Sequence, residues 1–178
     1  VASQDMQIIA LHPVTARTYV HLGIVTFAGK VSVVQQPSLD RAQSLNVVNG
    51  LKLSYGTYLY DGLKQAVRTA GTDGLRDIMV LSDGRDTSKT PRASALAAVK
   101  KAQVKVDVVA LAQSLGDEKL LEPLSTAGNG SVISANDPKG LGQVFADEAQ
   151  TLAKQIQITA TPSSSSKREG TLSVAVDA

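Results

Sequence analysis

Two short polar segments place oxygen-bearing side chains next to elements of predicted regular structure. Residues 78–81 form an uninterrupted apolar run, typical of a buried strand, and Ser82 and Asp83 follow it directly. Thr57 stands earlier, at the start of a predicted helix. The Asp83 carboxylate and the Thr57 hydroxyl, with Ser82 as a neighbour, are hard oxygen ligands of the type that Mg²⁺, Mn²⁺ or Ca²⁺ prefers. Each residue alone also has a structural interpretation, Thr57 as a helix cap and Asp83 as a turn residue.

Such ligands need a scaffold, and apolar periodicity predicts strands that alternate with helices. The predicted strands are residues 19–27, 31–34, 78–81, 106–111 and 132–133. The predicted helices are residues 57–70, a helix from the cap Thr90 and first-turn Pro91 through Ala102, residues 117–124, and a long helix after Pro138 through Leu152. This pattern indicates an α/β fold in three layers, with a mainly parallel, Rossmann-like sheet flanked by helices and an antiparallel edge hairpin near 31–34.

The loops that follow the strands are where a site is expected. In open parallel sheets, ligands collect outside the carboxyl ends of the strands, here after Phe27, Leu81, Leu111 and Ile133. Only the loop after Leu81 stands out, because it begins with Ser82 and Asp83.

The two ends of the chain differ from this central domain, which we assign to residues 17–154. Residues 1–16 read as an irregular N-terminal segment, and Met6 to Leu11 form either an irregular helix or a substitute strand. Only seven residues separate Leu11 from Tyr19, too few for a parallel crossover of about a dozen or more, so either the chain is truncated or its sheet is incomplete. Residues 155–178 alternate apolar and polar side chains around a serine-rich loop, which predicts a C-terminal β-hairpin extension.

Composition excludes several classes of function. Charged residues make up 19% of the chain and the net charge is +2, without the basic stripe that nucleic-acid binding requires. The chain has no Cys, which excludes a thiol nucleophile, a zinc–thiolate site and disulfides. No apolar run approaches the roughly 20 residues that span a bilayer, so we expect this segment to be soluble, without direct membrane insertion.

Catalytic motifs are equally scarce, so we do not expect an enzyme. His12 precedes a proline and His21 lies in a predicted strand, and neither is placed as a base for Ser82. No Gly-x-Gly-x-x-Gly sequence opens a helix after a strand, so no catalytic or cofactor-binding residues are assigned. The segment Asp86-Thr-Ser-Lys-Thr90 matches the pattern Asp-x-Ser-x-Thr, but it follows the wrong strand, and we interpret it as a loop and helix cap.

Three phrases of the sequence resemble the von Willebrand factor A (vWA) family. They are Gly23-Ile-Val-Thr-Phe27, Gly56-Thr57 at the start of a helix, and Ile78-Met-Val-Leu-Ser-Asp-Gly84, within a match from about Tyr19 to Leu152. In that family a metal-ion-dependent adhesion site (MIDAS) uses an Asp-x-Ser-x-Ser loop after the first strand, a Thr before a helix, and an Asp that closes a later strand. Thr57 and Asp83 match the second and third elements, whereas nothing before Tyr19 matches the first strand and its loop.

The resemblance implies binding of another protein. A Mg²⁺, Mn²⁺ or Ca²⁺ ion held by Thr57 and Asp83 would offer an open coordination position to an Asp or Glu of the partner. Because the Asp-x-Ser-x-Ser loop is missing, we expect cation binding to be weak or absent. The quoted phrases look most like domains fused, in actinobacteria, to membrane parts of type II secretion or tight-adherence systems. This implies an extracytoplasmic domain, membrane-tethered in the full-length protein, in secretion or pilus assembly.

Two alternatives and one further interaction stay open. The domain could be a structural scaffold with a vestigial metal site, or an α/β hydrolase or phosphotransfer enzyme. A sheet that lacks its usual first strand could also associate with another copy through its exposed edges.

Overall fold

A six-stranded sheet forms the middle layer, in the order β3-β2-β1-β4-β5-β6. The structure is a computed structural model that describes residues 6–14, 19–52, 54–82, 86–111, 115–135 and 138–153. The strands are β1 (Met6–Val14), β2 (Tyr19–Phe27), β3 (Val31–Ser38), β4 (Asp77–Ser82), β5 (Lys105–Leu111) and β6 (Val132–Ala135). Strands β2, β4, β5 and β6 point in one direction, and β1 and β3 point in the opposite direction. The predicted α/β fold and the edge hairpin of β2 with β3 are confirmed.

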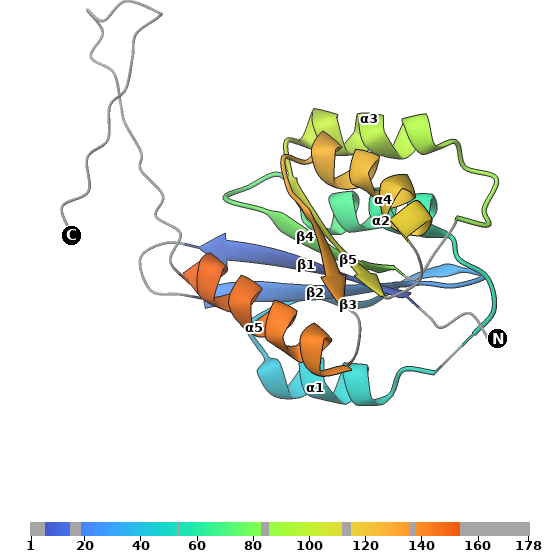
Figure 1. Cartoon of the computed structure of the whole chain (residues 1–178). Coiled ribbons are helices and arrows are strands. Elements are labelled where there is room, and N and C mark those ends of the chain that lie inside the picture. The colour runs from blue at the N-terminus through green and yellow to red at the C-terminus, as the bar shows by residue number, and fades with distance from the viewer. Residues whose placement is uncertain are drawn as a thin grey trace, which may run out of the picture.

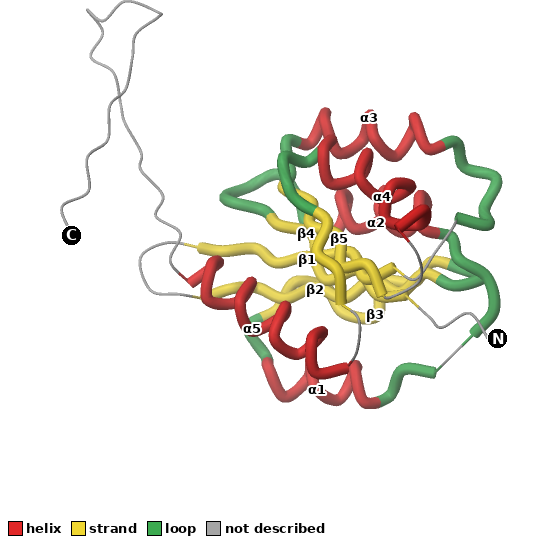
Figure 2. Tube along the Cα trace, in the orientation of Figure 1, coloured by secondary structure: helices red, strands yellow, loops and turns green. Residues whose placement is uncertain are grey.

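Helices cover both faces of this sheet (Figure 1, Figure 2). They are α1 (Arg41–Asn49), α2 (Leu59–Thr69), α3 (Arg92–Ala102), α4 (Leu115–Ala127) and α5 (Pro138–Ala153). α2, α3 and α4 lie together on one face, and α1 and α5 lie on the other. None of the helices in the described ranges is long and apolar enough to cross a membrane.

The larger core lies between the sheet and helices α2, α3 and α4. It is built mainly from Val, Ala and Leu side chains, with Phe27 as its one buried aromatic ring among the described residues. A smaller core lies under α5, where Met79, Val109 and Ala135 meet side chains of that helix. Short apolar side chains thus let the helices approach the sheet closely, in keeping with the few aromatic residues of the sequence.

Residues Met6–Val14 form a strand, β1, which is the second of the two alternatives that the sequence allowed for the N-terminal segment. It pairs antiparallel with β2 along its whole length, from Met6 opposite Phe27 to Val14 opposite Tyr19, and antiparallel with β4 on its other side. A short connection forces this direction, since a parallel crossover needs about a dozen residues or more. The predicted C-terminal hairpin of residues 155–178 lies outside the described residues.

The helices differ from the sequence-based predictions in several places. Helix α4 is longer than the predicted 117–124 at both ends. The helix expected from Thr57 begins at Leu59. Thr90 does not cap α3, because Pro91 is the N-cap residue and makes no side-chain cap hydrogen bond. Helix α1 was not predicted at all: its one buried residue is Ser44, so it lacks an apolar stripe.

Gly62 marks a close contact between α2 and β2. A Cβ atom at this position would lie 2.7 Å from the Cβ and Cγ atoms of Phe27, which is fully buried. Gly142 in α5 is also helical, but a Cβ there would meet nothing within 4 Å. The same residue type therefore has a packing role in one helix and none in the other.

We expect Gly62→Ala to destabilise the fold by about 1–3 kcal/mol, because the added methyl overpacks the core against Phe27. Gly142→Ala is the matched control, and it should stabilise the fold by about 0.5–1 kcal/mol through helix propensity. Urea unfolding of both variants measures the free energy of unfolding. Equal effects of the two substitutions would contradict the close packing of α2 on β2.

Candidate functional site

Four strands end at one edge of the sheet, which we call the carboxyl edge. β2 ends there at Phe27, β4 at Ser82, β5 at Leu111 and β6 at Ala135, as the strand registers place them. The antiparallel β1 instead begins at this edge, with Met6 opposite Phe27. Its own carboxyl end, Val14, lies at the opposite edge, so a loop after β1 cannot contribute ligands here.

The loop before α2 is held tightly at this edge. The Tyr58 N–H donates to the carbonyl of Ala28, just after β2 ends, at 3.0 Å. Gly56 has a φ of +89°, and a Cβ on it would lie 3.1 Å from the Cα of Gly29. A Cβ on Gly29 would in turn lie 2.8 Å from the carbonyl oxygen of Tyr55. Because the two backbone segments meet so closely, glycine is needed at both Gly29 and Gly56.

Thr57 is buried and clamped by Thr87 from the segment after β4. The Thr57 N–H donates to the Thr87 hydroxyl at 2.8 Å, and the Thr87 N–H donates to the Thr57 carbonyl at 2.8 Å. The Thr87 hydroxyl in turn donates to the Thr57 carbonyl at 3.3 Å. The clamp uses the backbone of Thr57 and not its hydroxyl, so Thr57 is not the helix cap that one interpretation of the sequence offered.

Asp86 caps α2 from outside that helix. One carboxylate oxygen accepts from the Tyr60 N–H at 3.1 Å, and the other accepts from the Ser88 N–H at 3.0 Å and the Ser88 hydroxyl at 2.7 Å. The Thr90 hydroxyl donates to the Asp61 carboxylate at 2.6 Å. Residues 86–90 are thus a loop and cap, as predicted, but the capped helix is α2 and not α3.

Of the predicted ligand Asp83 and its neighbour Ser82, the structure describes only Ser82. Ser82 closes β4, pairs in register with Ala110 of β5, and is fully buried. Asp83 lies outside the described residues. The structure therefore places Thr57 and Ser82 at the carboxyl edge and leaves the position of the Asp83 carboxylate a prediction. In the described ranges, no three His, Cys, Asp or Glu side chains come close enough to hold a metal ion.

Tyr60, in the first turn of α2, has a raised pKa. Burial raises the pKa of its phenol, the Arg92 guanidinium partly offsets that rise, and the Asp86 carboxylate adds to it. Tyr60 therefore stays a neutral phenol across the physiological range.

The two histidines lie away from Ser82. His12 and His21 are opposite one another in the β1–β2 pair. The next residue of β1 towards its start, Leu11, is paired with Asp77 at the beginning of β4, whereas Ser82 is at its end. Five residues of extended strand correspond to roughly 16 Å. The backbone thus keeps both histidines towards the edge opposite to Ser82.

A buried charge cluster that the sequence did not reveal lies at that opposite edge. Lys105 forms ion pairs with Asp77, at 3.2 Å, and with Asp107. Asp107 is 1% exposed and also accepts from the N–H and hydroxyl of Ser131, at 2.8 and 3.1 Å. These contacts tie the amino ends of β4 and β5 to the segment before β6, which is a structural role.

The order of the strands and the helices on both faces define an α/β protein of the vWA class. A family model of the von Willebrand factor type A domain matches residues 4–147. The chain belongs to the von Willebrand factor type A domain family. The match begins before β1, so it is wider than the resemblance seen from Tyr19 onwards, and it confirms that resemblance.

Solved structures agree on the fold. BatB from Bacteroides thetaiotaomicron is 16% identical with a TM-score of 0.58, over 75% of this chain and 79% of that one. An aerotolerance-related membrane protein from Bacteroides fragilis is 17% identical with a TM-score of 0.56, over 72% and 78%. The SpRpn10 VWA domain is 12% identical with a TM-score of 0.55, over 70% of each chain. No curated relative matches the chain. Domains of this family generally mediate protein–protein interactions.

We expect Asp86→Ala to destabilise the fold by about 1–2 kcal/mol, because it removes the cap of α2 and the acceptor for Ser88. Asp73→Ala is the control, since Asp73 is exposed and its carboxylate accepts only from the neighbouring Thr72 hydroxyl. Urea unfolding should show a change within about 0.5 kcal/mol for that control. If Asp86→Ala were as stable as the control, the capping role would be wrong.

Proposed function

We propose that this domain binds another protein at the carboxyl edge through a divalent cation. Thr57 and Asp83 would hold the ion, with Ser82 as their neighbour, and Mg²⁺, Mn²⁺ or Ca²⁺ fits these oxygen donors. A carboxylate of the partner would fill an open coordination position.

The observation that carries this proposal is the clamp between Thr57 and Thr87. It fixes the loop before α2 to the segment that follows β4. Asp83 comes directly after that strand in the sequence. The clamp does not use the Thr57 hydroxyl. The hydroxyl is therefore positioned by backbone contacts alone. The donor set of one hydroxyl and one carboxylate supports a cation that keeps most of its waters, and thus weak binding until a partner carboxylate joins.

For the cellular setting we propose a bacterial secretion or pilus-assembly system of the type II or tight-adherence kind. The support is the likeness of the phrases around Gly23, Thr57 and Asp83 to such domains. In that setting the domain would be extracytoplasmic and tethered to the membrane in the full-length protein. One structure of the same fold comes from a membrane protein, which agrees with a tether.

A structural scaffold with a vestigial metal site is the second candidate. The direction of β1 favours it, because the carboxyl end of that strand lies away from Ser82. A scaffold would be indifferent to cations and to the loss of Asp83. An α/β hydrolase or phosphotransfer enzyme has no support in the described residues beyond its fold class.

Thermal unfolding with Mg²⁺, with Mn²⁺ and with chelator separates these candidates. A cation at about ten times its Kd stabilises the folded state by about 1.4 kcal/mol, which raises Tm by about 3–6 °C for a chain of this size. Asp83→Ala and Thr57→Val should both abolish the rise. Thr57→Val preserves the backbone clamp, so its Tm in chelator should stay close to that of the parent.

Asp73→Ala, which removes an exposed carboxylate elsewhere, is the control and should keep the full cation response. If the parent shows no rise with either cation, the scaffold becomes the leading candidate. If Asp83→Ala keeps the rise, the cation binds elsewhere and the proposed ligands are wrong.

A further inference from the structure

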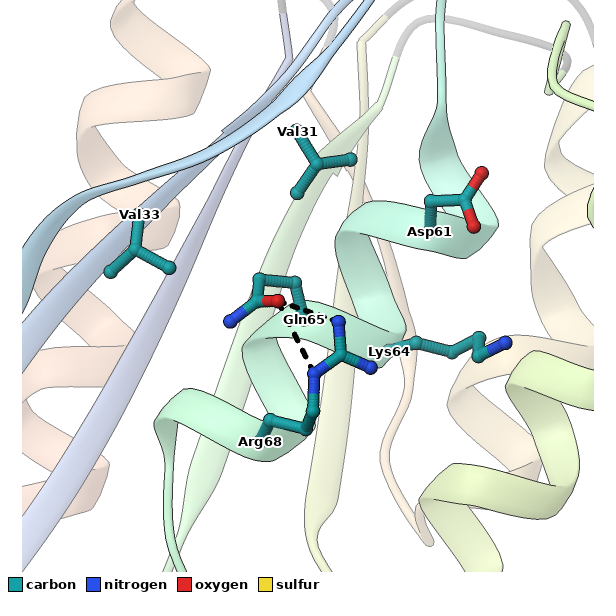
Figure 3. Close-up of a pocket in the computed structure, with 6 residues that line it drawn as sticks. All are labelled: Val31, Val33, Asp61, Lys64, Gln65 and Arg68. Atoms are coloured by element: carbon teal, nitrogen blue, oxygen red, sulfur yellow. Dashed lines mark hydrogen bonds between the residues drawn. The ribbon is translucent and has the colours of Figure 1, made fainter.

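A groove runs between the edge strand β3 and helix α2, and none of the proposed cation ligands is among its lining residues. Its volume is about 320 Å³, and it is lined by Val31, Val33, Asp61, Lys64, Gln65 and Arg68. Figure 3 shows the two valines on the strand and the polar side chains on the helix, with Gln65 and Arg68 between the helix and the viewer. The groove thus has an apolar wall from the sheet and a polar wall from α2.

The backbone of β3 is open on the groove side. Among the described strands, β3 pairs only with β2. The Ala28 N–H donates to the Lys30 carbonyl, so Phe27 and Val31 form a non-hydrogen-bonded pair of the antiparallel ladder. Because such pairs alternate, Val33 opposite Val25 is of the same kind. The N–H and C=O groups of Val31 and Val33 therefore point away from β2, towards the free edge.

The groove also carries unneutralised positive charge. Arg68 is exposed, and its guanidinium donates twice to Gln65 Oε1, at 3.2 and 2.5 Å. Neither Arg68 nor Lys64 pairs with a carboxylate in the described part of the chain. Asp61 keeps its negative charge although the Thr90 hydroxyl donates to it. With Lys64 and Arg68 positive and Asp61 negative, the lining has a net charge of +1. A matching ligand would thus bring negative charge of its own.

We propose that an extended segment of a partner protein, which carries both apolar and acidic side chains on one of its two faces, pairs with β3 as a further strand. Its backbone would bond to the outward groups of Val31 and Val33, since main-chain hydrogen bonds supply affinity in strand addition. Side chains two residues apart lie on the same face of a strand. On the face covered by α2, apolar side chains of the partner would pack on the two valines, and an acidic side chain of the same set would meet Arg68 and Lys64. This surface is separate from the proposed cation site, and the binding needs no metal.

The probe is a short blocked peptide with valine and glutamate at alternate positions of one face and threonine between them, for example Val-Thr-Val-Thr-Glu, added in chelator to the ¹⁵N-labelled protein. We expect the amide signals of Val31 and Val33 to shift most. Lysine in place of glutamate should weaken binding, and N-methylation of alternate peptide nitrogens should abolish it. Using chelator keeps this result independent of the cation-dependent function.

Arg68→Glu should weaken peptide binding by roughly fivefold to tenfold, because an attractive, partly exposed charge pair becomes repulsive. Lys101→Glu is the matched control: both residues are exposed in the last turn of a helix, so the helix-dipole cost is similar, but Lys101 is outside the groove. It should change the affinity by less than about twofold. For each variant, amide spectra that are unchanged away from the substituted helix, α2 for Arg68→Glu and α3 for Lys101→Glu, would verify that it folds.

Three results would overturn the proposal. The first is no shift at Val31 and Val33 at millimolar peptide, and the second is equal binding of the N-methylated peptide. The third is a shift of these same signals on dilution of the protein alone, which would mean that a second copy of the chain occupies the edge.

Discussion

The antiparallel placement of β1 between β2 and β4 is the constraint on which the sheet depends. β1 joins the β2–β3 hairpin on one side to the parallel strands β4, β5 and β6 on the other. Without it, two sheet edges would lose their hydrogen-bond partners at the centre of the molecule, which costs more than at a rim where water replaces them. Its direction also decides the chemistry of the carboxyl edge, because β1 begins there and delivers no following loop to it.

Helix α2 extends from the carboxyl edge of the sheet along the groove beside β3. Its beginning is held at the carboxyl edge by the Ala28 carbonyl and the Asp86 carboxylate, and its core face rests on Phe27 through Gly62. Its outer face forms one wall of the groove beside β3. A helix fixed at both its end and its inner face keeps its exposed side chains in a defined position relative to the sheet, which is a requirement for selective binding.

The two ends of the parallel strands use polar groups differently. At the amino end, Asp77 and Asp107 are buried, and the partly exposed Lys105 forms an ion pair with each, which is how these carboxylates tolerate a low-dielectric interior. At the carboxyl end, the Asp86 carboxylate accepts from the Tyr60 N–H at the start of α2, and the Thr87 hydroxyl accepts from the Thr57 N–H just before it. These polar groups organise loops. In the described residues of this edge, hydrogen bonds therefore hold the loops in place.

The sequence by itself determined the strands and helices whose apolar side chains repeat with a clear period, and through them the fold class. It also predicted that Thr57 and Ser82 would share the carboxyl edge, since loops after parallel strands and before helices meet there. It left open whether Met6 to Leu11 form a helix or a strand, and it did not place that strand between β2 and β4, because strand order is set by tertiary contacts. It missed α1, whose stability rests on the Asp40 cap and on Ser44 against Gln35 in place of an apolar stripe. It assigned the Asp86 loop to the following helix, because capping by a segment some 26 residues away leaves no local signal.

The groove beside β3 came from tertiary structure alone: a free edge and a helix side by side exist only once the order of the strands is set.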